Sequence, residues 1–236
     1  MGRPPLVDVI IPALDEEQAL PLVLRDLRAQ PWPLRHIVVV DNGSTDRTAE
    51  VAEAAGAVVL KEPQRGYGAA CLRGLRFLSQ LSLPPDVVVF LDGDYSDDPA
   101  EVAWLLDAIE AGADLAIGSR VLGRAEPGSL TPQQRIGNIL ATTLIRLVYG
   151  QRYTDLGPMR AIRYPALCAL AMRDTGYGWT VEMQVKAVRL GLRVVEVPVS
   201  YRRRRGGASK VSGTLRGTLG AGYKILYTVL RHATAR

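Results

Sequence analysis

Residues 87–99, VVVFLDGDYSDDP, constrain the fold more than any other stretch of the chain. The first five are apolar, which is typical of a strand that is buried on both faces of a parallel sheet. Asp92, Gly93 and Asp94 follow directly, at the point where that strand must end. Because ligands bind outside the carboxyl ends of the strands in an open α/β sheet, we expect these residues at a binding site.

The carboxylates of Asp92 and Asp94 predict a cation site. Two carboxylates one residue apart repel one another unless a cation lies nearby. Mg²⁺ and Mn²⁺ take oxygen ligands and commonly link protein carboxylates to substrate phosphates. Gly93 leaves room for a ligand to approach the backbone. For an isolated Asp-x-Asp the alternative is a solvated acidic turn, so the rest of the chain decides between the two.

Strand and helix patterns alternate over residues 7–120, which favours a parallel, doubly wound α/β sheet flanked by helices. The expected strands are 7–12, 36–40, 57–60, 87–91 and 114–120. Asp15 is expected to cap the first helix. The polar residues that follow these strands, Glu16, Asp41, Asn42, Asp92 and Asp94, should line one edge of the sheet. The glycine-rich turn around Gly68 opens a helix and is expected to offer its amides to an anion.

The second half is less regular. Residues 121–132 are predicted to form a mobile loop and residues 155–160 a polar turn. Helices are expected at 134–149, 165–172 and 181–190, and a late strand at 194–199. No linker divides the chain, so we predict one domain over residues 1–212 and an amphipathic basic helix over 213–236. That helix suits a membrane interface, the domain surface or a partner helix equally well.

The net charge of +5 comes from 29 basic and 24 acidic residues, and the carboxyl-terminal segment is strongly basic. An anionic partner is therefore expected, which leaves phosphate, a membrane surface and nucleic acid. The arginines at 202–205 lack the aromatic platform or helix-turn-helix pattern of nucleic-acid binders, so nucleic acid is not expected. The two cysteines form no zinc pattern. No leader and no spanning run of about 20 apolar residues is present, which predicts a cytoplasmic protein.

Several short motifs occur in a fixed order along the chain, at residues 11–16, 40–46, 65–70, 92–94, 118–120 and 204–210. They read IPALDE, VDNGSTD, RGYGAA, DGD, GSR and RRGGASK. Together they resemble family 2 glycosyltransferases of the GT-A fold, and most of all the dolichyl-phosphate mannosyltransferase and polyprenyl-phosphate glycosyltransferase branch. Asp15 stands where this family usually has Asn. Asn42 stands where it usually has an acid that contacts the base, which leaves the nucleotide open.

The resemblance implies roles for particular residues. The nucleotide-sugar would be bound by Pro12, Leu14, Glu16, Val40, Asn42, Gly68, Asp92, Gly93 and Asp94. Mg²⁺ or Mn²⁺ would be held by Asp92, Asp94 and Ser96. Phosphate oxygens of the donor or acceptor would be bound by Arg120, Arg135, Arg204, Ser209 and Lys210. The catalytic set would be Asp94, Arg120 and, if the acceptor is a hydroxyl, Asp155 as general base.

The implied activity is a metal-dependent, inverting transfer of a hexose from a GDP-mannose or UDP-glucose type donor to a polyprenyl or dolichyl phosphate. A lipid phosphate is already anionic and needs no general base, which fits a site with basic residues and no evident catalytic histidine. The implied partner is a membrane surface or membrane protein at the cytoplasmic face. The alternatives are a soluble hydroxyl acceptor on the same fold, a non-catalytic nucleotide-sugar-binding subunit, and a nucleotidyltransferase.

Overall fold

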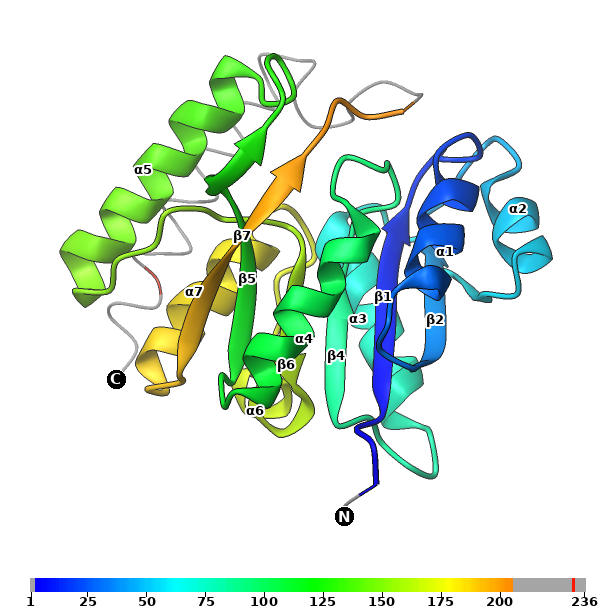
Figure 1. Cartoon of the computed structure of the whole chain (residues 1–236), viewed down its shortest axis with the longest axis horizontal. Coiled ribbons are helices and arrows are strands. Elements are labelled where there is room, and N and C mark those ends of the chain that lie inside the picture. Colours follow the sequence, from blue (N-terminus) through cyan, green and yellow to red (C-terminus); the bar gives the residue numbers. More distant parts are fainter. Residues whose placement is uncertain (1–2, 206–230, 232–236) are drawn as a thin grey trace.

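The computed structural model describes residues 3–205 and residue 231 (Figure 1). Within these residues one seven-stranded sheet has the strand order β3-β2-β1-β4-β6-β5-β7. The strands are β1 (Val7–Ala13), β2 (Leu34–Asp41), β3 (Val58–Lys61), β4 (Val87–Phe90), β5 (Leu115–Ala125), β6 (Arg160–Arg163) and β7 (Val194–Tyr201). The helices are α1 (Leu20–Ala29), α2 (Thr48–Ala54), α3 (Tyr67–Ser79), α4 (Val102–Glu110), α5 (Pro132–Tyr149), α6 (Tyr164–Leu170) and α7 (Trp179–Arg189), with a 3₁₀ turn at Pro99–Glu101 before α4.

The first half of the sheet is parallel, as predicted. β1 lies between β2 and β4 and pairs in parallel with both, and β2 pairs in parallel with β3. All four residues of β4 are buried because helices cover both faces of the sheet (Figure 1). One face packs on α1 and α4, for example through Leu24 and Leu105. The other packs on α3 and α7, for example through Leu78 and Val185. The carboxyl ends of β1, β2 and β4 therefore meet at one edge.

β6 is a strand where the sequence predicted the end of a polar turn. It lies antiparallel between β4 and β5, with Val87 opposite Arg163 and Ala116 opposite Ala161. Four residues with two arginines carry too little periodicity to predict a strand, so the pairing partners determine this one. The Arg160 side chain is fully buried and donates to the carbonyl oxygens of Leu156, Gly157 and Thr180. Burial lowers the pKa of Arg160 to about 10.

The prediction of a mobile loop over residues 121–132 is wrong for residues 121–125, which belong to β5. β5 continues to Ala125 and pairs in parallel with β7, with a shift of register between Ser119 and Arg124. A methyl group on Gly123 would lie 2.0 Å from the carbonyl oxygen of Val199, so this glycine permits the close approach of the two strands. Only residues 126–131 connect β5 to α5. Pairing with a distant strand determines this extension, and no local pattern indicates it.

The cap predicted at Asp15 is also wrong. α1 begins at Leu20 after Ala19 and has no side-chain cap. Asp15 has a φ of 53° and accepts a hydrogen bond from the Thr45 amide at 2.7 Å, so it connects the loops that follow β1 and β2. The predicted helix at 213–236, with Ser209 and Lys210, lies outside the described residues. Across the part of the chain that the structure describes, no helix is both long enough and apolar enough to span a membrane.

Gly157 offers a test of how the turn before β6 is held against the sheet. A methyl group there would lie 1.8 Å from the carbonyl oxygen of Gly118 in β5. We expect Gly157→Ala to lower the free energy of unfolding by at least about 2 kcal/mol in urea denaturation, because backbone must move. Gly176→Ala is the matched control, since its methyl group would meet Asp174 Oδ1 at an ordinary 3.6 Å. Equal stabilities of the two variants would contradict this packing.

Candidate active site

A cavity of about 390 Å³ lies at the carboxyl ends of β1, β2 and β4. Its lining contains most of the residues that the sequence predicted for donor binding, together with one predicted phosphate ligand. These predicted residues are Pro12, Leu14, Glu16, Asn42, Asp92, Gly93, Asp94 and Arg204. They come from loops far apart in sequence, and the parallel strand order brings them together. Asp41, the last residue of β2, lies at this edge as predicted but does not line the cavity, and its side chain accepts a hydrogen bond from the Ser44 amide.

Negative charge is concentrated in the loop that follows β4. Asp92 is partly buried, and its Oδ1 atom is fully covered and has no hydrogen-bond partner within the described chain. Burial and the charge of Asp94 raise the pKa of Asp92 to about 7. Asp97 is 2% exposed and neither of its oxygens has a partner among the described residues. Burial, followed by the charge of Asp92, raises the pKa of Asp97 well above its ordinary value. These carboxylates are therefore short of positive charge.

Arg204 supplies positive charge to this loop from the other end of the chain. Its Nη2 atom lies 2.5 Å from Glu16 Oε1 and 3.2 Å from Asp94 Oδ2. Backbone hydrogen bonds hold the segment on the loop: the Arg202 amide donates to Ser96 at 2.7 Å and the Arg205 amide to Asp94 at 3.2 Å. The side chain of Arg204 thus spans the cavity between the predicted nucleoside side and the predicted cation side.

Arg120 and Asp155 form a buried ion pair. Arg120 Nε and Nη2 each donate to an oxygen of Asp155 at 2.7 Å, and the Arg120 amide donates at 2.8 Å. The guanidinium also lies 4.9 Å from the ring centre of Tyr201. Asp155 is fully buried and both of its oxygens accept hydrogen bonds from Arg120, which argues against the role of general base that was predicted for a hydroxyl acceptor; that role stays a prediction. Arg120 does not line the cavity, and its positive charge acts on Asp92 and Asp97 from below it.

Asn42 holds a neighbouring loop in place. Its Nδ2 donates to the carbonyl oxygens of Glu62 at 2.9 Å and Gln64 at 2.7 Å, and its Oδ1 accepts from the Gly66 amide at 2.8 Å. An aspartate could not donate the first two bonds. This gives a physical reason for an amide at the position where the resembling family usually has an acid.

The amides of the glycine-rich turn are used within the protein. Gly68 donates to the carbonyl oxygen of Gly176 at 3.2 Å, and Ala69 donates to that of Thr175 at 2.9 Å. The prediction that Gly68 offers its amide to an anion is therefore wrong. The turn instead carries Arg65 and Tyr67 to the cavity wall.

Three other predicted residues lie away from the cavity lining. Val40 is buried in the sheet core, and Arg135 is exposed on α5. Ser96 is buried and donates its amide to Asp94 Oδ1 at 2.9 Å, so it orients that carboxylate rather than facing the cavity. The lining also contains side chains that the sequence did not predict, namely Arg65, Tyr67, Gln134, Tyr177 and Tyr201. Only tertiary structure brings Gln134 and Tyr177 here, whereas Tyr201 is adjacent to the arginine run.

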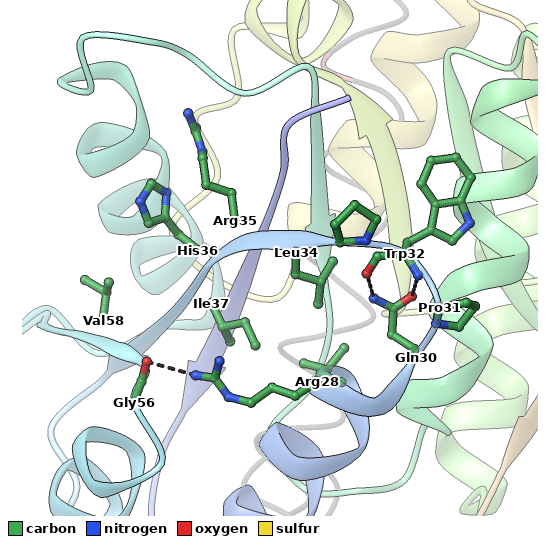
Figure 2. Close-up of a pocket in the computed structure, with 12 residues that line it drawn as sticks. Arg28, Gln30, Pro31, Trp32, Leu34, Arg35, His36, Ile37, Gly56 and Val58 are labelled. Atoms are coloured by element: carbon green, nitrogen blue, oxygen red, sulfur yellow. Dashed lines mark hydrogen bonds between the residues drawn. The ribbon is translucent and has the colours of Figure 1, made fainter. Parts of the chain in front are cut away.

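A second hollow, of about 380 Å³, lies at the opposite edge of the sheet (Figure 2). None of the predicted site residues lines it. Arg28 and Gln30 bond within the protein. Arg28 donates to the carbonyl oxygen of Gly56 at 2.9 Å and Gln30 exchanges hydrogen bonds with the Trp32 backbone (Figure 2). Arg28 also donates to the carbonyl oxygen of Ala55 at 3.0 Å. The predicted carboxylates, among them Asp92 with its unpartnered Oδ1, line the first cavity, which is the candidate active site.

The cavity suits a ligand that brings both a cation and phosphates. Oxygen donors with no partner inside the protein fit a hard divalent cation, which prefers carboxylate ligands. No group of three or more His, Cys, Asp or Glu side chains in residues 3–205 and 231 is arranged to hold a metal by itself. Mg²⁺ is commonly bound by one or two carboxylates plus substrate phosphates, so Asp92 and Asp94 fit that mode.

The family model described as glycosyl transferase family 2 matches residues 8–170. An uncharacterized glycosyltransferase of Mycobacterium tuberculosis is 39% identical, over 90% of this chain and 93% of the relative. Polyprenol monophosphomannose synthase of Mycolicibacterium smegmatis is 34% identical, over 87% of this chain and 81% of the relative. Undecaprenyl-phosphate mannosyltransferase of Micrococcus luteus is also 34% identical, over 88% of each chain.

Among solved structures, glucosyl-3-phosphoglycerate synthase from Mycobacterium tuberculosis, in complex with Mn²⁺, UDP and glucosyl-3-phosphoglycerate, matches with a TM-score of 0.78. The match has 23% identity and covers 98% of this chain and 81% of that chain, so it bears on the fold. The family match and the 39% identical relative show that this chain belongs to glycosyl transferase family 2, and that it is a glycosyltransferase with the predicted GT-A fold.

Proposed function

We propose that this glycosyltransferase moves a hexose from a nucleotide-sugar to a polyprenyl phosphate with the help of Mg²⁺ or Mn²⁺. The main support for the proposal is that one cavity contains both the carboxylates that follow β4 and, facing them, the guanidinium of Arg204. The names of two relatives that are 34% identical, a polyprenol monophosphomannose synthase and an undecaprenyl-phosphate mannosyltransferase, support this acceptor class. The Mn²⁺ and UDP in the structurally similar synthase support this donor class.

The reaction needs the bond between the sugar and the nucleoside diphosphate to break as a phosphate oxygen of the acceptor attacks from the opposite face. Asp94 and Asp92 would hold the cation, which when bound offsets the negative charge of the departing diphosphate. Glu16, Leu14 and the loop fixed by Asn42 would bind the nucleoside. Arg204 would bind phosphate oxygens. Fixed charges of this kind stabilise a transition state without reorganisation, so we assign catalysis mainly to electrostatics.

A phosphate acceptor fits the site better than a hydroxyl acceptor. A hydroxyl must lose a proton to a general base within hydrogen-bond reach, whereas a lipid phosphate is already anionic. Asp155, the candidate base, is buried and paired with Arg120. His36 lies at the start of β2, at the edge away from the cavity, and contacts Asp8. Neither the predicted base nor His36 is placed to deprotonate a hydroxyl, and the cavity carboxylates Asp92 and Asp94 are assigned to the cation, which supports an acceptor that needs no deprotonation.

Asp94→Ala tests the cation site. We expect the variant to lose metal-dependent binding of the donor nucleotide, and kcat to fall by about 10²–10³-fold, because a fixed charge is removed from the reaction centre. Calorimetry with GDP-mannose and UDP-glucose, each with Mg²⁺, with Mn²⁺ and with chelator, measures the binding and identifies the donor. Asp107→Asn, a carboxylate on α4 that bonds to Trp32, is the control and should bind as the unaltered protein does. Unchanged metal-dependent affinity in Asp94→Ala would refute the assignment.

Arg204→Ala tests the basic side of the cavity. We expect a fall in kcat/KM of about 10²-fold with polyprenyl phosphate. Tm should fall only moderately, because the side chain lines the cavity and its lost ion pairs are with Glu16 and Asp94 rather than with the core. Arg204→Lys should recover part of the activity, since it keeps the charge but loses the planar fork. Normal kinetics together with a large loss of thermal stability would make Arg204 a structural residue.

Asp155→Asn distinguishes the two acceptor classes. We expect the free energy of unfolding to fall by about 3–5 kcal/mol, because the variant leaves Arg120 charged and buried without its partner. Glu17→Gln, which alters an ion pair with Arg47 at the surface, should change it by less than about 1 kcal/mol. If Asp155→Asn instead keeps full stability and loses transfer only to a soluble alcohol, the hydroxyl-acceptor alternative gains and the polyprenyl phosphate proposal fails.

A further inference from the structure

One side of α5 exposes apolar side chains that the fold does not use. We call Ile136, Ile139, Leu140, Leu147 and Val148 the α5 stripe. Ile136, Ile139 and Leu147 are 67%, 64% and 75% exposed, which is unusual for three large apolar side chains on one helix. The spacing of 136, 139, 140 and 147 places these four on one face of the helix.

The opposite side of α5 anchors the helix to the domain. Ala141 and Ile145 are fully buried in the core cluster beneath the sheet. Both ends are fixed, by a capping box between Thr131 and Gln134 and by Gly150 in a left-handed conformation. The α5 stripe is therefore held facing outward by a well-packed helix, and its exposure does not come from a poorly formed element.

The charged side chains of α5 itself are all basic. Residues 132–149 contain Arg135 and Arg146, both exposed, and no Asp or Glu. Before the helix, the end of β5 exposes Arg124 together with two apolar residues, Val121 and Leu122. One acidic residue, exposed Glu126, lies in the connection between Arg124 and the helix. Apolar side chains with arginines on the same helix match the surface of an anionic bilayer, where the apolar side chains enter the acyl boundary and the arginines meet the headgroups.

The arginines of α5 make two other partners of the α5 stripe less favourable, namely a second copy of the chain and the chain's own carboxyl-terminal segment. Two copies of this chain paired through α5 would bring arginines against arginines, which is unfavourable. Residues 206–236 also contain no Asp or Glu, so this segment offers no opposite charge to α5. An anionic lipid surface is the occupant that complements both the apolar and the basic side chains.

The stripe begins at the active site. Gln134, in the first turn of α5, lines the cavity with Asp92, Asp94 and Arg204, and Ile136 follows two residues later. We propose that the α5 stripe docks the enzyme on an anionic membrane, with the cavity at the surface where a polyprenyl phosphate presents its headgroup. This rests on the proposed function for its acceptor, but the docking surface can be tested separately.

The test is flotation of the full chain with vesicles of phosphatidylcholine, with and without phosphatidylglycerol. We expect binding to the anionic vesicles that weakens with salt. Ile136→Ser/Ile139→Ser should lower the partition coefficient at least about 10-fold, because two large apolar side chains no longer enter the bilayer. Arg146→Gln should lower it several-fold on anionic vesicles only. Leu83→Ser/Trp104→Ser, which removes side chains that are 52% and 50% exposed elsewhere, is the matched control and should bind like the unaltered protein.

Three results would overturn the docking surface. The first is that Ile136→Ser/Ile139→Ser binds vesicles as well as the unaltered protein does. The second is that the variant becomes monomeric where the unaltered chain is a dimer, which would make the stripe an interface between copies. The third is a large fall in the Tm of the variant, which would show that the chain itself covers the stripe in solution.

Activity measurements separate this proposal from the proposed function. We expect Ile136→Ser/Ile139→Ser to transfer sugar to a short, water-soluble geranyl phosphate at the normal rate, and to lose transfer to polyprenyl phosphate embedded in vesicles. Normal transfer from vesicles would overturn the docking surface and leave the proposed function standing. Loss of vesicle binding in a protein that glycosylates neither phosphate would support the surface and overturn the proposed acceptor.

Discussion

The repulsion among carboxylates at the end of β4 is the constraint around which the second half of the molecule is arranged. Asp97 is buried, Asp92 is partly buried with its Oδ1 atom fully covered, and Asp94, between them in sequence, lines the cavity. Unpaired charge of this kind costs several kcal/mol per ion even after relaxation. Two arginines from distant parts of the chain, Arg120 on β5 and Arg204 after β7, offset this negative charge. Burial, followed by the charge of Asp94, still raises the pKa of Asp92 to about 7, and this side chain lines the cavity where we propose that a cation binds.

The two arginines are themselves supported by a chain of contacts that runs through β7. Arg120 is held by Asp155, and Glu196 on β7 accepts hydrogen bonds from the amides of Thr154 at 2.9 Å and Asp155 at 3.0 Å. β7 then ends at Tyr201, whose ring lies against Arg120, and leads directly to Arg204. β7 thus positions Arg120 indirectly, through the turn that contains Asp155, and it leads directly to Arg204 at its own carboxyl end. Docking β7 against β5 is therefore as much a requirement of the site as the carboxylates are.

The sequence predicted the parallel half of the sheet because each of its strands is apolar enough to be recognised alone. Asp92 and Asp94 were predictable for the same reason, since they follow directly where an apolar run stops. β6 and the end of β5 were not, because a four-residue segment such as Arg160–Arg163 becomes a strand only when β4 and β5 flank it. Gln134 shows the same limit at the site, since a helix position reaches the cavity only after the whole sheet has formed.

Some motif residues serve the fold and others line the cavity. Arg120 and Gly68 belong to motifs, yet the Arg120 side chain and the Gly68 amide are engaged by protein atoms and neither residue lines the cavity. A sequence motif therefore does not indicate whether its side chains contact a ligand or other atoms of the protein. Glu16, Asp92, Asp94 and Arg204 remain in the cavity lining. Because two of these residues follow β4 and one precedes α1, while Arg204 arrives from beyond β7, reactive charge is assembled only when both halves of the sheet are joined.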